Sequence, residues 1–117
     1  MIFKLNENDS VELKYSFRSS IYFEQIANHS LDLTNFTAND LITLFYSVVV
    51  ASLQKAKKPI ISMLAFMDYI DDFNGGDKCI IDFSNWYVNI LKNQYELLAD
   101  EKEDKKEEKS KGKKKQA

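Results

Sequence analysis

The sequence predicts a small, mainly α-helical domain of about four helices, with a short N-terminal β-hairpin that makes it an α+β fold, and a disordered charged tail. Apolar residues recur at helical spacing in four segments, whereas residues 2–15 alternate in polarity as strands do. Residues 100–117 carry six acids and eight lysines but no large apolar side chain. Such a segment cannot offset the entropy of ordering itself. We therefore expect one folded domain at residues 1–99 and a flexible tail at residues 100–117.

The hairpin is expected from two alternating segments, Ile2–Leu5 and Ser10–Tyr15, on either side of the turn-forming residues Asn6–Asp9. Its apolar face consists of Val11, Leu13 and Tyr15. An isolated two-stranded hairpin is only marginally stable in water. The apolar face must therefore pack on the helices that follow, or the hairpin must pair with another chain.

The first helix is expected to begin at Ser19 or Ser20, either of which can cap its first turn, and to end at residues 28–30. Between these ends runs a helical stripe of Ile21, Tyr22, Gln25, Ile26 and His29. Residues 31–36 form a connector to the second helix.

The second helix is expected from Ala38 to about Lys55. Thr37 and Asp40 have the spacing of a capping box, with Asp in place of the preferred Glu. Ten of the thirteen positions 41–53 are apolar, which is typical of a helix at the centre of a fold. The β-favouring residues Val48–Val50 keep a strand as the weaker alternative.

Two further helices are expected after Pro59. One runs from about Ile60 to Asp72 and is followed by the turn Asn74–Asp77. The other runs from about Ile81 to Asp100, with Trp86 as its core anchor.

The third helix carries more apolar residues than one buried stripe requires. Phe66, Tyr69 and Phe73 fall beside the stripe of Met63, Met67 and Ile70. A wide apolar band is typical of a partner-binding surface, and methionine suits an adaptable one. The candidate partner-binding residues are Met63, Phe66, Met67 and Tyr69. Core packing is the alternative for each of them.

The sequence offers no set of residues for catalysis, for a cofactor or for a metal ion. His29 is the only histidine and Cys79 the only cysteine, and Cys79 is interpreted as a small buried residue. The acidic cluster Asp68–Asp82 lacks the spacing of a calcium loop and is interpreted as a solvated patch. We therefore expect a protein that is not an enzyme.

Charge and hydropathy argue against a membrane or nucleic acid as a partner. The longest apolar stretch, Leu41–Leu53, has thirteen residues, whereas a bilayer span needs about 20. The net charge is −2, which gives no global reason to bind nucleic acid. Lys55, Lys57 and Lys58 form a basic patch, but no aromatic side chain is interleaved with them. Single-strand binders usually combine both features.

The order of these elements resembles the tail assembly chaperones of long-tailed bacteriophages and prophages. The resemblance covers about residues 1–99: a hairpin running into Tyr15–Arg18, the helix with Ile21–Ile26, the apolar helix, the segment Pro59–Ile70 and a last amphipathic helix. It implies a non-enzymatic protein in the cytoplasm of the bacterial host. Such a protein binds the tape measure protein, keeps it soluble during tail assembly and is absent from the mature virion.

The resemblance also implies a second form of the protein. Family members are often made in two lengths by ribosomal frameshifting, the longer form binding the tail tube protein, and Lys113–Lys115 must be encoded by A-rich codons that permit slippage. A many-copy role is compatible with a homo-oligomer. The alternative function is a small nucleic-acid-associated or regulatory adaptor that uses Lys55–Lys58 and the lysine tail.

Overall fold

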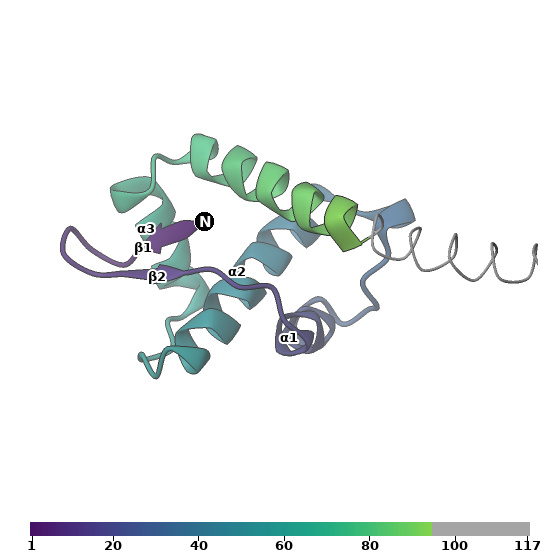
Figure 1. The fold of residues 1–117 in the computed structure, drawn as a ribbon, viewed down its shortest axis with the longest axis horizontal. Helices are drawn as coiled ribbons and strands as arrows, with labels where there is room; N and C mark the ends of the chain where they lie inside the picture. Colours follow the sequence, from purple (N-terminus) through teal and green to yellow (C-terminus); the bar gives the residue numbers. More distant parts are fainter. Residues whose placement is uncertain (95–117) are drawn as a thin grey trace, which may run out of the picture. The chain divides into compact units, whose positions relative to one another are not determined.

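The computed structural model describes residues 1–94, which form four α-helices and a two-stranded antiparallel hairpin (Figure 1). The elements are β1 (Ile2–Lys4), β2 (Ser10–Glu12), α1 (Phe17–Ala27), the 3₁₀ turn η1 (Leu33–Asn35), α2 (Ala38–Lys55), α3 (Met63–Phe73) and a C-terminal helix that begins at residue 77 and is described to residue 94. The predicted mainly α fold class with an N-terminal hairpin is confirmed. The predicted tail at residues 100–117 lies outside the described residues.

The chain divides into two compact units, Met1–Ser84 and a second that begins at Asn85. The fold and surfaces described below belong to the first unit unless stated otherwise. The expectation that residues 1–99 form one domain stays a prediction.

The hairpin pairs Phe3 with Val11 at its centre, and both side chains are buried. The strands end earlier than predicted. Leu13 still donates from its backbone N–H to the Met1 carbonyl oxygen at 2.8 Å. Beyond Leu13 the chain turns toward α2, where Lys14 donates its backbone N–H to Ser52 Oγ at 3.0 Å.

The first helix begins at Phe17, two residues before the earlier of the predicted starts. Its N-cap is Ser16, whose Oγ accepts from the Ser19 backbone N–H at 3.3 Å, while Ser19 Oγ accepts from the Ser16 backbone N–H at 3.2 Å. Ser16 and Ser19 therefore form a capping box in which Ser16 is the N-cap and Ser19 lies within the first turn. The prediction that Ser19 or Ser20 is the cap is wrong. The helix ends at Asn28 in the left-handed conformation, with φ 61°, as the sequence predicts.

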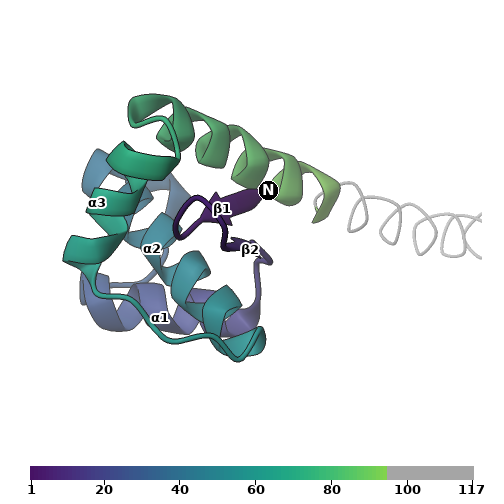
Figure 2. The same cartoon turned by 90° about the vertical axis from the view of Figure 1, so that its left-hand side faces the viewer.

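The second helix has the predicted bounds and the predicted cap. Thr37 Oγ1 accepts from the Asp40 backbone N–H at 3.1 Å, and Asp40 Oδ2 accepts from the Thr37 backbone N–H at 3.1 Å. Residues 48–50 are helical, which excludes the strand alternative. The helix packs against α1 and β2 (Figures 1 and 2), so most of its circumference is buried, and this explains why its sequence is apolar on nearly all sides.

Four phenylalanine rings from four elements form the centre of the first unit. Phe45 of α2 stacks on Phe83 of the C-terminal helix, with ring centroids 4.3 Å apart and planes inclined by 3°. Phe3 of β1 meets Phe66 of α3 at 5.5 Å, and Phe45 contacts both Phe3 and Phe66 edge-on. All four side chains are fully buried. Large rings at these contacts hold the hairpin, α2 and α3 together.

The C-terminal helix starts at residue 77 rather than Ile81. Gly75 and Gly76 adopt positive φ values of 88° and 63°, and the chain turns there and re-enters a helix at once. In the second unit Tyr87 is 4% exposed, whereas Trp86 is half-buried, so Tyr87 takes the buried position predicted for Trp86. Within residues 1–94, no helix has the length and apolar character needed to cross a bilayer.

Candidate functional site

The third helix, which carries the predicted partner surface, begins at Met63 because Ser62 caps it. Ser62 Oγ accepts from the Ala65 backbone N–H at 3.1 Å, and the Ser62 carbonyl oxygen accepts from the Phe66 N–H at 2.9 Å. Ile60 and Ile61, which were predicted to lie in the helix, precede it in a non-helical segment after Pro59. Ser62 is the first residue after Pro59 whose side chain can satisfy a free N–H, and the helix starts there.

The inward face of α3 is formed by Phe66 and Ile70, which are 0% and 5% exposed. Phe66 meets Phe45 at 5.0 Å and Tyr46 at 5.4 Å between ring centroids. Burial removes Phe66 from the accessible surface, so we correct its assignment from partner contact to core residue. Because the Phe66 ring packs against Phe45 and Tyr46 inside the domain, it is not available for contact with a partner.

Met63 and Tyr69 lie at the border between the buried and exposed faces of α3. Both side chains are half-buried, and the Tyr69 ring lies 5.8 Å from that of Phe73, with the planes tilted by 56°. Their exposed edges are accessible to a partner, while the rest of each side chain packs within the domain.

The outward face of α3 is apolar where a solvated helix would be polar. Leu64 is 68% exposed and Met67 44% exposed, and Ile60, just before the helix, is 55% exposed. Leu64 and Met67 are three positions apart and therefore adjacent on the helix surface. We call Ile60, Leu64 and Met67 the outer α3 surface. Asp68 and Asp71, both exposed, lie beside it on the helix.

Sequence reasoning thus found one residue of this surface, Met67, and missed Leu64 and Ile60. Neither of these two is among the partner-binding residues that the sequence predicts. The positions of two aspartates could have shown that Leu64 faces water. Leu64, Asp68 and Asp71 share one face of the helix, and aspartates without a cationic partner are almost never buried in a core.

A contact between two titratable groups, His29 and Asp40, joins the connector between α1 and α2 to the first turn of α2. His29 Nδ1 lies 2.8 Å from the Ser30 carbonyl oxygen, and Nε2 lies 3.0 Å from Asp40 Oδ1. A carbonyl and a carboxylate only accept, so both contacts are hydrogen bonds when the imidazole carries both protons. The Ser30 carbonyl, and after it the Asp40 carboxylate, raises the pKa of His29. The Thr37 backbone N–H, and further the His29 ring, lowers the pKa of Asp40.

A cysteine and a histidine in contact can act as nucleophile and base, but Cys79 and His29 are not brought together. His29 bonds to Ser30 and Asp40 and packs edge-on against the Phe23 ring at 5.6 Å. Cys79 is 4% exposed in the C-terminal helix, and burial, with a smaller effect of Asp82, raises the pKa of its thiol to about 11. A thiol with this pKa carries almost no thiolate at neutral pH and is a poor nucleophile.

The acidic side chains Asp68, Asp71, Asp72, Asp77 and Asp82 are all exposed, as the solvated-patch interpretation predicts. Within residues 1–94, no group of three or more His, Cys, Asp or Glu side chains is arranged to hold a metal ion. No family model matches the chain, and neither a curated protein nor a solved structure is significantly similar to it.

Proposed function

We propose that the chain is a non-enzymatic tail assembly chaperone of a long-tailed bacteriophage or prophage. In this proposal it works in the cytoplasm of the bacterial host, binds the tape measure protein, keeps that protein soluble during tail assembly and is absent from the mature virion. The observation that carries the proposal is the outer α3 surface, where Ile60, Leu64 and Met67 expose about half or more of their side chains to water.

The outer α3 surface suits a helical, partly apolar partner. Helix-in-groove recognition depends on apolar anchors three and four positions apart, and Leu64 and Met67 have this spacing. Asp68 and Asp71 beside them favour basic residues at the edge of the partner's apolar stripe. The unbranched Met67 side chain can adapt to apolar residues of different shape, which a chaperone for a long sequence needs.

The apolar area of the outer α3 surface is small, so one copy of the chain binds its partner weakly. Complete burial of one large aliphatic side chain stabilises a complex by roughly 1.5–3 kcal/mol, and association itself costs about 4–15 kcal/mol. Two or three partly exposed side chains therefore cannot hold a partner tightly alone. Copies that also contact one another, as in a homo-oligomer, would reinforce one another's binding along one long chain, and that fits a protein made in excess over its partner.

The longer, frameshifted form belongs to the same proposal. It would share residues 1–94 and add a segment that binds the tail tube protein. Intact mass spectrometry of the product expressed from the native gene checks this, because slippage within the codons for Lys113–Lys115 gives a second species with a changed C-terminus.

Co-expression with the tape measure protein tests the proposed function. The partner to use is the product of the very long reading frame expected downstream of this gene. We expect the wild-type chain to raise the soluble fraction of that product and to co-purify with it. Leu64→Glu and Met67→Glu should abolish both effects, because a carboxylate in an apolar contact is left without a partner.

The matched control is Ile26→Glu. Ile26 on α1 is 45% exposed, almost the same as Met67, so the two substitutions disturb the free protein to a similar extent. The control should co-purify like the wild type, and circular dichroism should show equal helix content in all variants. If the control and Met67→Glu lose co-purification equally, the outer α3 surface is not the binding site. A soluble tape measure protein that never co-purifies with the wild-type chain would overturn the proposed function.

A further inference from the structure

Two hollows on the side where α1 and α2 meet the hairpin share one wall. The first, of about 230 Å³, lies between the segment 10–16 and the C-terminal end of α2. The second, of about 310 Å³, lies between the first turn of α1 and α2. Ser16, Ala51 and Lys55 line both. The two hollows therefore lie side by side, and together they give this surface an elongated depression.

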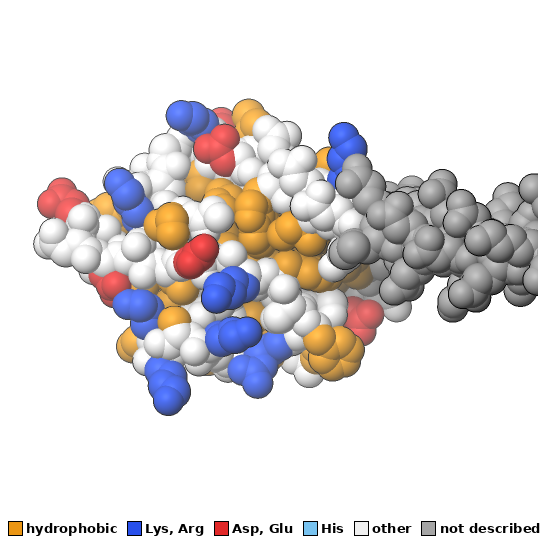
Figure 3. Space-filling model, viewed as in Figure 1, with side chains coloured by type: hydrophobic (Ala, Val, Ile, Leu, Met, Phe, Trp, Pro, Cys, Tyr) orange, Lys and Arg blue, Asp and Glu red, His pale blue; other side chains and the backbone are white. Residues whose placement is uncertain are grey.

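Positive charge is concentrated along this depression. Lys14, Lys55 and Lys58 line the first hollow, and Lys55 and Arg18 line the second. We call these four residues and the depression between them the basic groove. Residues 1–84 carry seven basic and eleven acidic residues, so more than half of the cations of an acidic unit lie in one place. Figure 3 shows Lys and Arg side chains gathered in the lower part of that face, where α1 and the end of α2 lie in Figure 1.

Most of this charge is not neutralised within the groove. Lys58 is paired with Asp9 at 2.6 Å, and the Arg18 guanidinium donates to the neutral Gln54 Oε1 at 3.3 Å. Within the described part of the chain, Lys14 and Lys55 form no ion pair. Glu12 is the single acidic residue that lines either hollow. The groove thus presents a net positive surface that an anion can approach.

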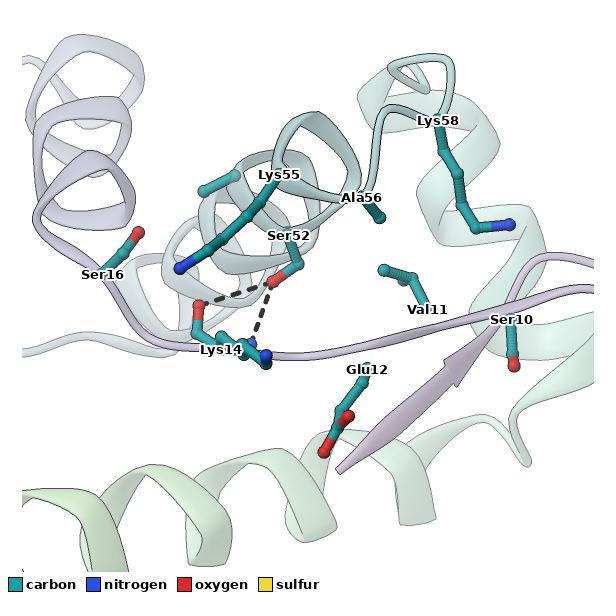
Figure 4. Close-up of a pocket in the computed structure, with 10 residues that line it drawn as sticks. Ser10, Val11, Glu12, Lys14, Ser16, Ser52, Lys55, Ala56 and Lys58 are labelled. Carbon is teal, nitrogen blue, oxygen red and sulfur yellow. Dashed lines mark hydrogen bonds between the residues drawn. The ribbon is translucent and has the colours of Figure 1, made fainter.

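The backbone beneath the groove is held in place by Ser52. Its Oγ accepts from the Lys14 backbone N–H at 3.0 Å and donates to the Lys14 carbonyl oxygen at 3.4 Å, as the dashed lines in Figure 4 show. Lys55 and Lys58 extend from the end of α2 toward the segment that carries Lys14 and Ser10 (Figure 4). Lys55 extends to the side of Lys14 and Ser16, whereas Lys58 extends to the opposite side, near Ser10 (Figure 4).

An aromatic side chain stands at the end of the groove. Phe17 lines the second hollow beside Arg18 and Lys55, and its side chain is 80% exposed, the largest exposure among the large apolar residues described. Along the sequence no aromatic residue accompanies Lys55–Lys58. The fold supplies one by placing the start of α1 beside the end of α2.

We propose that the basic groove binds single-stranded nucleic acid, with the phosphates on Lys14 and Lys55 and one base stacked on Phe17. A cationic track next to an exposed aromatic ring is the combination on which sequence-tolerant single-strand binding rests. An acidic peptide could use the lysines, but its carboxylates do not stack on an aromatic ring as a base does. The net charge of the whole chain argues against nucleic acid, yet binding depends on the local charge at the groove. This role goes beyond the proposed chaperone function and uses a different surface from α3.

Fluorescence anisotropy of the full chain with a fluorescein-labelled oligothymidylate of fifteen nucleotides tests the proposal at several salt concentrations. For single strands, each phosphate contact removed should reduce the slope of log K against log salt by about 0.7. The double variant Lys14→Gln, Lys55→Gln should therefore lose about 1.4 from the slope. Phe17→Ala should weaken binding roughly 5- to 150-fold at an unchanged slope, and Phe17→Trp should preserve binding.

The control is Lys78→Gln, which removes one positive charge from the same unit outside the groove, as Lys14→Gln or Lys55→Gln alone does within it, and keeps the lysine tail. It should bind like the wild type. If Lys78→Gln weakens binding of the oligothymidylate as much as the groove variants do, the proposal is wrong, and the oligothymidylate is attracted by the overall charge or by the lysine tail. Unchanged affinity in Phe17→Ala would also overturn it. Tighter binding of a decaglutamate peptide than of the oligothymidylate would assign the groove to an acidic peptide instead.

Discussion

The side-chain amide of Asn74 pairs with the backbone of Lys4, seventy residues earlier in the chain. Asn74 Oδ1 accepts from the Lys4 N–H at 2.8 Å, and Asn74 Nδ2 donates to the Lys4 carbonyl oxygen at 2.9 Å. The same Nδ2 donates to the Tyr69 carbonyl oxygen at 2.8 Å in the last turn of α3. One amide thus continues the hydrogen-bonding edge of β1 and joins the hairpin to the end of α3.

We expect Asn74→Ala to lower the free energy of unfolding by about 1–3 kcal/mol, because three hydrogen bonds worth about 0.5–1.5 kcal/mol each are lost and water replaces part of them. Asn74→Asp keeps the acceptor for the Lys4 N–H but places a carboxylate oxygen against the Lys4 and Tyr69 carbonyl oxygens, so it should destabilise the fold at least as much as Asn74→Ala. Urea unfolding followed by circular dichroism measures the differences. A wild-type midpoint for Asn74→Ala would show that the hairpin is held by the phenylalanine core alone.

Phe66 and Met67 are neighbours in sequence with opposite roles, and alanine substitutions separate them. Phe66→Ala should lower the free energy of unfolding by about 3–5 kcal/mol, because it leaves a cavity between Phe3 and Phe45. Met67→Ala should stay within about 0.5 kcal/mol of the wild type, as surface substitutions do. Denaturant midpoints measured under the same conditions decide the matter. If both substitutions lower the free energy of unfolding by a similar amount, Met67 is a core residue and does not belong to the outer α3 surface.

The end of α2 contains a lysine in a conformation that favours glycine. Lys57 has φ 58°, its N–H donates to the Gln54 carbonyl oxygen at 3.1 Å, and the Lys58 N–H donates to the Leu53 carbonyl oxygen at 2.9 Å. This is the bonding pattern of a Schellman motif, in which glycine usually occupies the position of Lys57. A left-handed L-residue costs roughly 1–2 kcal/mol.

Lys57→Gly should therefore raise the free energy of unfolding by about 1 kcal/mol, after part of the gain is offset by the greater freedom of glycine in the unfolded chain. Lys57→Ala is the control, since it removes the same charge and keeps the Cβ atom, and it should give no such gain. Thermal unfolding of the three proteins measures the effect. A less stable Lys57→Gly variant would mean that the lysine side chain contributes more than its backbone conformation costs.

His29 should make stability depend on pH near neutrality. Its folded-state pKa is raised above the ordinary value of 6.5, because the Ser30 carbonyl and the Asp40 carboxylate both accept from the protonated ring. The folded state therefore holds this proton more tightly than the unfolded state does. The resulting stabilisation is fully present below about pH 6.5 and is lost as the pH rises through the raised folded-state pKa.

Two measurements check the histidine prediction. His29 is the only histidine, so its ring resonance in a proton NMR titration reports one pKa, which should exceed 6.5. The urea midpoint of the wild type should fall from pH 6 to pH 8.5, and in His29→Gln this fall should disappear. A His29 titration at or below 6.5 would show that the two contacts do not hold the protonated ring in solution.

Cys79 should be almost unreactive in the folded protein, because burial limits access and its thiol pKa is about 11. Reaction with a chromogenic disulfide reagent at pH 7.5 should be slow in buffer and should reach one equivalent at once in denaturant. The chain has no other cysteine, so the signal has a single origin. Rapid stoichiometric reaction without denaturant would mean that the helix from residue 77 opens readily.

Local patterns in the sequence were sufficient to predict the mainly α fold class, the hairpin and the bounds of α2. Each depends on contacts between residues close in the chain: the alternation around Asn6–Asp9, and the capping box of Thr37 and Asp40. The start of α1 was misplaced because Ser16, Ser19 and Ser20 can all cap a helix, and their relative geometry decides between them.

Only the tertiary structure decided which residues of α3 face water. Phe66 and Leu64 are both large and apolar, and helical periodicity alone does not say which side of an apolar helix meets the ring of Phe45. The basic groove depended on the fold in the same way, because Phe17 and Lys55 are far apart in sequence and become neighbours only when α1 packs against α2. Capping and alternation are local and can be read from the chain, whereas burial and surface charge arise from contacts between distant segments.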